Sequence, residues 1–488
     1  MEDHGRRGGP SMKRIVVGWM LFVGCLLVFI PAYAQVPEMM KLTMDGKERV
    51  CLDCHHDPNI NTNEGVASSQ ALCFECHAKA ICQRKVGDRA VSLQVTLDSF
   101  KKNRHAYVAC IDCHRDVARS PHQSLDKAQC LSCHPVHGEG TVGDPHLRVS
   151  CQACHSPSKF VYLDRAADKV RLSNFDDKMV PIGLIDHSLS NTQDKTLCLK
   201  CHFPKNQVGA AAAVLPSKSF LCILCHNAPL SIGHPMFWAA FLIFLFGLIM
   251  TVLFWLQGSV AGEEKSLHRK IALGSEEIWG TLFSRKMGPI LKTIFFDVFL
   301  QRRILQESVQ RWSIHSLIYL SILSRFGLSL FTYFVYRISP TSALAQALID
   351  KNNGFVAFTY DFLGLLIILG LLLAIIQRFV IRPAHVASEG QDNLAIAIIG
   401  VLILLGFILE GVRILVTRIP AEKAVYAFIG YPLSNLFSWL PWDWPSLYVY
   451  LWYAHAVVGA LFIAYLPFGK MKHMIHTPLS LILNIKRK

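Results

Sequence analysis

Seven copies of one short pattern, Cys-x-x-Cys-His, constrain this chain more than any other feature. They lie between residues 51 and 226 and contain fourteen of its 16 cysteines. A lone Cys-x-x-Cys pair also suits a zinc knuckle, a redox pair or a disulfide, but none of these requires His at the next position. His makes up only 21 of 488 residues, so its presence after all seven pairs predicts attachment sites for c-type haem.

Each motif is expected to supply two thioether bonds and one axial ligand. The two thiols bond to the porphyrin, and the following His is the proximal ligand of the iron. The attachment cysteines are Cys51, Cys54, Cys73, Cys76, Cys110, Cys113, Cys130, Cys133, Cys151, Cys154, Cys198, Cys201, Cys222 and Cys225. The proximal histidines are His55, His77, His114, His134, His155, His202 and His226.

A second group of histidines matches the motifs in number. These residues, which lie outside the motifs in 35–234, are His56, His105, His122, His137, His146, His187 and His234. We predict them to be the distal ligands, because bis-His ligation fills both axial positions and suits electron transfer. For any one of them the alternative is a solvated loop residue. His56 is adjacent to His55 and is expected to serve a neighbouring iron, and His234 borders the membrane region.

Composition divides the chain into three regions. Residues 1–34 contain Lys13 and Arg14, an apolar run and Ala32-Tyr33-Ala34, which predicts a secretory signal peptide, or alternatively an uncleaved anchor helix. Residues 35–234 form the predicted periplasmic heptahaem domain. With no sustained strand pattern, we expect short helices around the motifs, little other regular structure, and haems as the core. The fold class is all-α.

Residues 235–488 contain five apolar stretches, each long enough to cross a bilayer. They cover about 236–256, 312–336, 355–380, 393–417 and 447–468. With the haem domain outside, the cytoplasmic segments carry 15 Lys and Arg and the outer loops carry 4. This agrees with the positive-inside rule and predicts a bacterial inner-membrane protein. Most of the net charge of +14 lies in this region, which argues against nucleic acid as a partner.

Histidines and charged groups inside a membrane are costly and mark candidate functional sites. His315 and His473 lie at the same depth near the cytoplasmic side, where they are expected to bind one b-type haem between helices. His455 lies in the outer half of the fifth span, about 27 Å from His473 if the helix is continuous. Glu410 lies in the outer half of the fourth span. A quinol loses two protons together with its two electrons, and a carboxylate near its hydroxyl could accept one of them. Glu410 with His455 is therefore the candidate quinol site; alternatively, Glu410 only pairs with Arg413 on one helix.

Two stretches resemble a known family: Gln310-Arg-Trp-Ser-Ile-His315, and Tyr465 to His473 with Pro478. They resemble the cytochrome b subunit of membrane nitrate reductase and its relatives in heterodisulfide and sulfite reductase-linked complexes. The resemblance implies five helices and haem b ligation by His315 and His473. It also implies that His455 ligates an outer haem whose second ligand would stand at position 325. That residue is Arg325, so the partner of His455 is either another residue, such as His234, or a nearby c haem replaces the outer b haem.

The presence of a heptahaem c domain and a membrane cytochrome b domain in one chain predicts a quinol:cytochrome c-type oxidoreductase with seven c haems and one or two b haems. Menaquinol or ubiquinol is the expected donor, and a periplasmic cytochrome or similar redox protein the acceptor. The layout is similar to that of inner-membrane b/c cytochromes of metal-respiring bacteria. Two alternatives remain: electron flow in the reverse direction, and a non-catalytic conduit or anchor subunit of a larger respiratory complex.

Overall fold

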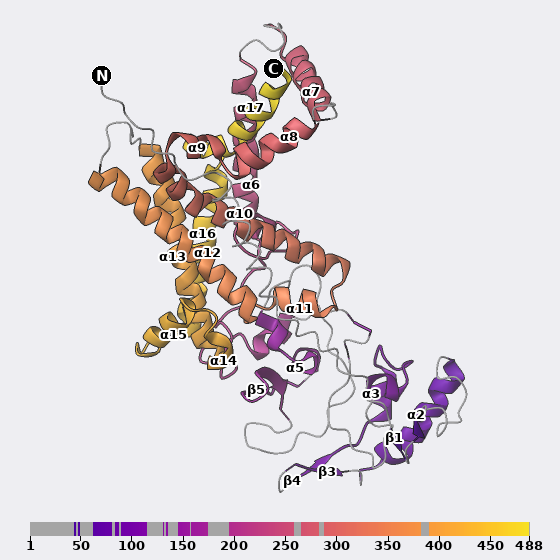
Figure 1. Ribbon diagram of the computed structural model, residues 1–488. Coiled ribbons are helices and arrows are strands. Elements are labelled where there is room, and N and C mark those ends of the chain that lie inside the picture. The colour runs from indigo at the N-terminus through magenta and orange to yellow at the C-terminus, as the bar shows by residue number, and fades with distance from the viewer. Residues whose placement is uncertain are drawn as a thin grey trace, which may run out of the picture.

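The computed structural model describes residues 43–44, 47–48, 62–80, 83–86, 89–114, 130, 133–134, 145–156, 158–173, 195–257, 265–282, 287–381 and 390–487 (Figure 1). The protein is predominantly helical, as the predicted all-α class requires. Several predicted features lie outside the described residues: the signal segment 1–34, the first motif (Cys51, Cys54 and His55), and His56, His122, His137 and His187.

In the part of the chain that the structure describes, five helices are long and apolar enough to cross a membrane, which confirms the predicted multi-pass arrangement. Each begins and ends within a few residues of the predicted bounds. They are α6 (Pro235–Trp255), α10 (Val309–Ile338), α12 (Gly354–Ile375), α13 (Gly390–Thr417) and α16 (Trp444–Tyr465). A π-helical turn, η9 (Ile376–Ile381), continues α12.

The five helices pack into one bundle. Helix α10 packs against α12, while α16 contacts both α13 and α6. Their shared core is apolar and includes Ile367, Leu402, Phe407, Ala460 and Ile463. Apolar side chains also remain exposed on the outside of the bundle, such as Phe246 on α6, as expected for surfaces that face lipid.

The region that carries the motifs consists of short elements. Its helices are α2 (Asn63–His77), α3 (Leu97–Lys101), α4 (Cys110–Cys113), η5 (Pro145–Arg148), α5 (Cys151–His155), η6 (Lys195–Lys200) and η7 (Phe220–Leu224). Within its described residues, three antiparallel hairpins accompany them: β1–β2 (Thr43–Met44, Lys47–Glu48), β3–β4 (Gln83–Val86, Arg89–Ser92) and β5–β6 (Val161–Asp164, Lys169–Leu172). The helices were predicted from the sequence, but the hairpins were not, because their strands are too short for a periodic pattern.

A helical layer covers the end of the bundle opposite the motifs (Figure 1). It contains α7 (Leu267–Leu282), α8 (Met287–Thr293), the π-helical turn η8 (Ile294–Phe299), α9 (Arg302–Glu307) and α17 (His473–Arg487). Between α16 and α17 the chain turns at Gly469 (φ +59°) into η10 (Gly469–Lys472). His455 and His473 therefore lie on different helices, so the distance of about 27 Å along one continuous helix does not apply to them.

Short helices also lie on the motif side of the bundle (Figure 1). They are α11 (Ala343–Ile349), α14 (Ala421–Ala424) and α15 (Gly430–Ser438). Arg148 Nη1 donates to the carbonyl oxygen of Thr417 at 2.8 Å, and Lys423 Nζ lies 3.1 Å from a carboxylate oxygen of Asp168. The backbone N–H of Ala212 donates to the carbonyl of Pro445 at 3.1 Å. The motif region is thus joined to the bundle at several points.

Candidate functional site

The described Cys-x-x-Cys-His motifs share one backbone geometry. In four of them, the N–H of the His donates to the carbonyl of the first Cys, at 2.9 Å for His114 and His134, 3.0 Å for His202 and 3.1 Å for His226. This bond closes one helical turn, so residues i, i+3 and i+4 lie on one face. Both thiols and the imidazole are therefore presented to the same side, as attachment to a single porphyrin requires.

The ring orientation of several of these histidines is fixed by a second contact. Nδ1 lies 3.1 Å from the carbonyl oxygen of Leu93 in His77, 3.0 Å from that of Ala211 in His202 and 3.3 Å from that of Asn227 in His226. Because a carbonyl only accepts, Nδ1 carries the proton and Nε2 keeps its lone pair. Metal-ligating histidines commonly show this arrangement.

Among the described histidines, four pairs face each other across similar distances. The ring centres are 5.6 Å apart in His105–His134 and 5.9 Å apart in His146–His202. They are 6.4 Å apart in His226–His455 and 6.2 Å apart in His315–His473. Three of the pairs include a motif His. The fourth connects α10 to the first residue of α17.

These separations fit two imidazoles on opposite sides of one iron. Two metal–nitrogen bonds of about 2 Å, with about 1 Å from each nitrogen to the centre of its ring, place the ring centres about 6 Å apart. The four measured distances span this value. The first pair is slightly tighter than this arrangement, since its Nε2 atoms are 3.4 Å apart.

The inner pair, His315 and His473, has an orienting residue that the sequence analysis missed. Gln301 adopts a left-handed backbone conformation (φ 50°) before α9, and its Oε1 lies 2.8 Å from Nδ1 of His315. This contact leaves Nε2 of His315 available to a metal. Nothing in the sequence marks Gln301, because its place depends on how η8 and α9 pack at the end of the bundle.

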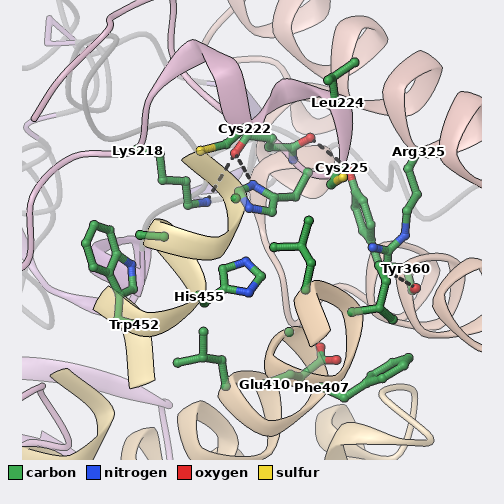
Figure 2. Close-up of a pocket in the computed structure, with 18 of the residues that line it drawn as sticks. Lys218, Cys222, Leu224, Cys225, Arg325, Tyr360, Phe407, Glu410, Trp452 and His455 are labelled. Carbon is green, nitrogen blue, oxygen red and sulfur yellow. Dashed lines mark hydrogen bonds between the residues drawn. The ribbon is translucent and has the colours of Figure 1, made fainter. Parts of the chain in front are cut away.

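The outer pair, His226 and His455, lines a cavity of about 240 Å³ between η7 and the bundle. Figure 2 shows the imidazole of His455 between the Cys222–Cys225 segment on one side and Glu410 on the other. The two rings are nearly parallel, with 26° between their planes. The surroundings of His226 exclude water and lower its pKa well below the usual range, so its ring is neutral, as ligation to iron requires.

Arg325 forms part of the wall of the same cavity. Its Nη2 donates to the carbonyl oxygen of Tyr360 at 2.5 Å, and its guanidinium lies 5.3 Å from the centre of the Tyr360 ring (Figure 2). A guanidinium has no lone pair to offer a metal. Arg325 therefore does not supply the ligand that the family resemblance implies at this position, although its charge faces the cavity.

Glu410 also lines this cavity, so the structure brings together the two residues predicted for the quinol site. Its Oε1 lies 3.8 Å from Nη2 of Arg413, whose Nη1 donates to Asn352 at 2.7 Å. Both interpretations of Glu410, as a member of the site and as the partner of Arg413, are compatible with this geometry. An added Cβ at Gly430 would stand 2.6 Å from Cγ of Glu410, so only glycine fits beside the carboxylate side chain.

His234 has a different environment from the other predicted distal ligands that the structure describes. It caps the N-terminus of α6, where its Nδ1 accepts from the N–H of Met236 at 3.4 Å, and its ring packs against Tyr453. Accepting at Nδ1 places the proton of a neutral ring on Nε2. His226, rather than His234, is the histidine that faces His455.

Consecutive motifs from the second to the sixth are neighbours in space. The thiols of Cys73 and Cys110 interact, as do those of Cys130 and Cys151, and Cys113 lies near Cys130. The sixth motif adjoins the fifth through Lys200, whose Nζ donates to the carbonyl of Cys154 at 3.0 Å. The motifs are thus arranged in chain order.

Comparison with known proteins finds relatives among membrane redox proteins. The chain is similar to a subunit of the dihydromethanophenazine:CoB–CoM heterodisulfide reductase of Methanosarcina thermophila, with 27% identity over 259 residues, or 50% of this chain and 88% of the relative. The corresponding protein of Methanosarcina acetivorans is 25% identical over 257 residues, with the same coverage. These matches confirm the resemblance to a membrane cytochrome b-type subunit.

A shorter match is to the EtfAB:quinone oxidoreductase of Syntrophomonas wolfei, 27% identical over 145 residues, or 27% of this chain and 20% of that protein. No family model and no solved structure matches the chain. Together with the five spans, the relatives support membrane electron transfer as the general role of the protein.

Proposed function

We propose that this protein is a membrane quinol:cytochrome c-type oxidoreductase. It transfers electrons from the quinone pool, through a haem b at the inner histidine pair, to seven c haems attached to the motif region. The observation that carries the proposal is the set of four histidine pairs with ring centres 5.6–6.4 Å apart. Three of these pairs include the proximal His of a Cys-x-x-Cys-His motif. In each of them a motif His and a second His, which are separate features of the sequence, lie next to each other in the structure.

The residues fit the groups that the proposal requires. His315 and His473 would hold the b haem, with Gln301 orienting the first of them. The motif cysteines and histidines would hold the c haems, and the carbonyl contacts at Nδ1 would keep the proximal rings in the ligating tautomer. Bound haems supply one-electron redox chemistry.

Oxidation of a quinol to a quinone releases two electrons and two protons. The electrons leave one at a time, and each hydroxyl needs a proton acceptor. If the quinol binds in the cavity at His455 rather than at the inner pair, Glu410, the carboxylate that lines this cavity, would accept one proton. The guanidinium of Arg413, 3.8 Å away, would stabilise the carboxylate form of Glu410 before the proton is transferred from the quinol. The second proton leaves to water.

A second candidate, an electron-conduit subunit of a larger complex, is favoured by the comparisons. The heterodisulfide reductase relatives are named as subunits, and this chain covers 88% of two of them. The layer formed by α7, α8 and α17 offers a surface for such a partner at the far end of the bundle. Helix α7 exposes Ile271 and Trp279 there. In this case electrons enter from the partner protein or leave to it.

Quinol oxidation by the purified full-length chain separates these functions. The chain would be placed in lipid nanodiscs, and absorbance of its covalent haems followed after addition of reduced menaquinone or ubiquinone analogues. We expect reduction of the c haems, its loss in His315→Ala, and its retention in His268→Ala, a matched substitution on exposed α7. Absence of reduction in a fully haem-loaded chain would contradict the oxidoreductase and leave the conduit. Faster electron transfer from reduced c haems to added quinone would indicate reverse flow.

A further inference from the structure

We propose that His226 and His455 are the two axial ligands of one haem, attached covalently to Cys222 and Cys225 at the surface of the membrane bundle. The inference rests on the proposed function, because it assumes that the motifs carry haem. It adds a site built jointly by the motif region and the fifth span. In this site a c haem stands where the family resemblance implies a second b haem.

The geometry of the pair is the first support. The ring centres of His226 and His455 are 6.4 Å apart with 26° between the ring planes, close to the separation of about 6 Å expected across one iron. Nδ1 of His226 lies 3.3 Å from the carbonyl oxygen of Asn227, which leaves its Nε2 for the metal. The ring of His455 lies next to the backbone of Leu402.

The second support is that the seventh motif packs into the membrane bundle. Helix η7 contacts both α10 and α16, and Leu221, Cys222 and Leu224 pack with the apolar core of the bundle. The following residues are anchored there too: the side chain of Asn227 donates to the carbonyl of Leu348 and accepts from Tyr360 Oη, both at 3.1 Å. A haem bound to this motif is therefore placed against the helices.

The sequence of the seventh motif agrees with this position. Its two inner residues, Ile223 and Leu224, are both apolar, and Phe220 and Leu221 precede it. The other six motifs each have at least one polar or small residue between the cysteines. Transfer of apolar side chains from water into the bundle is favourable, so this motif is the one suited to lie at its surface.

Cationic side chains and glycines line the cavity beside the pair. Lys218, Arg325 and Lys351 line it and would balance the two negative propionates. On the helical side, Gly406 and Gly459 also line it, and an added Cβ at Gly406 would stand 3.7 Å from Cε1 of His455. These glycines add no side chain to the wall of the cavity next to the imidazole.

The proposal also accounts for the histidines. Arg325 occupies the position of the missing family ligand, and His234 accepts a hydrogen bond at Nδ1 beside Tyr453. With His455 as the seventh distal ligand, the six remaining distal candidates serve the six other motifs, and His234 is not needed. The chain then holds seven c haems and one b haem.

The test is the coordination of the haems in the full-length His455→Gly variant. Covalent haem would be counted, and the spin state followed by electron paramagnetic resonance and by binding of carbon monoxide. We expect seven covalent haems and one extractable haem in both proteins. In the variant, one of the seven covalent haems becomes five-coordinate and binds one carbon monoxide per chain, and added imidazole restores the six-coordinate signal.

Two further variants keep the result decisive. His455→Met offers another axial ligand and is expected to keep all haems six-coordinate while raising the potential of one. His234→Ala identifies the competing ligand, because whichever substitution creates the five-coordinate haem marks the true partner. Loss of an extractable haem in His455→Gly, with all covalent haems unchanged, would overturn the shared site. Absence of covalent haem from the unmodified chain would instead overturn the proposed function.

Discussion

The two histidine pairs of the membrane bundle have nearly equal ring separations, 6.2 Å at the inner end and 6.4 Å at the outer end. They differ in where their residues come from. Both inner histidines belong to the membrane region, one on α10 and one at the start of α17. The outer pair joins His455 of α16 to His226 of a Cys-x-x-Cys-His motif.

This difference has a chemical consequence. The outer pair has two cysteines within four residues of its first His, so a haem held there would be attached by thioether bonds. The described residues around the inner pair contribute Gln301 and Tyr319, neither of which can form such a bond. The same ligand geometry thus predicts a covalent haem at one end and an extractable haem at the other.

The largest effect is expected from the double substitution Cys222→Ala and Cys225→Ala. It removes both attachment points of the outer haem, so one of seven covalent haems is lost, and quinol no longer reduces the remaining ones. The measurement is covalent haem content together with stopped-flow absorbance.

The matched control is Cys73→Ala with Cys76→Ala, which also removes one covalent haem but lies in α2, far from the bundle (Figure 1). Here reduction of the other haems is expected to continue. If both double variants lost electron transfer equally, the seventh motif would not be the point at which electrons enter the series of c haems.

His315→Ala tests whether the inner histidine pair holds the extractable haem. Removal of this ligand is expected to abolish the extractable haem while all seven covalent haems remain, because the inner pair has no attached cysteines. The pyridine haemochrome spectrum measures both species in one sample. Retention of the extractable haem would show that the inner pair is not its binding site.

Glu410→Gln tests the chemistry at the outer end without removing a histidine. The amide keeps the size of the side chain but cannot accept a proton. Quinol oxidation is therefore expected to slow by about 100-fold or more, with haem content unchanged. The rate with a quinol analogue, measured beside the direct reduction of the haems by dithionite, separates this effect from a blocked electron path. An unchanged quinol rate would leave Glu410 as the structural partner of Arg413.

The smallest of these effects is expected from Gln301→Leu. It removes the acceptor 2.8 Å from Nδ1 of His315, and loss of such an orienting contact weakens metal binding by about 10- to 100-fold. The extractable haem should be lost more readily on titration with apomyoglobin. Gln306→Leu, an exposed glutamine of the same helix α9, is the control and is expected to behave like the unmodified protein.

Much of this architecture could be predicted from sequence, because its signals are strong and local. The five apolar stretches predicted the spans within a few residues, since length and hydropathy alone decide whether a helix can cross a bilayer. The Cys-x-x-Cys-His spacing predicted the helical turns that place two thiols and a ring on one face. His315 and His473 were predicted to face each other, and their rings do so.

The remaining features depend on contacts between distant parts of the chain. His226 and His455 are 229 positions apart in the sequence, so their pairing emerges only when η7 packs against the bundle. The apolar pair Ile223-Leu224 was the available signal for that packing. Gln301 has no comparable signal, because its role comes from a left-handed turn. The end of the fifth span was predicted at residue 468, next to the turn at Gly469, but the short helix η10 that follows was not predicted.

A pyridine haemochrome assay on the purified full-length chain, counting covalent and extractable haem, tests the central claim most directly. The account predicts seven covalent haems and one extractable haem per chain: the outer pair shares a motif haem, and the inner pair holds the single b haem. Seven covalent and two extractable haems would contradict the shared outer site, since His455 would then ligate a second b haem. Absence of extractable haem would contradict the inner site and the path from quinol that depends on it.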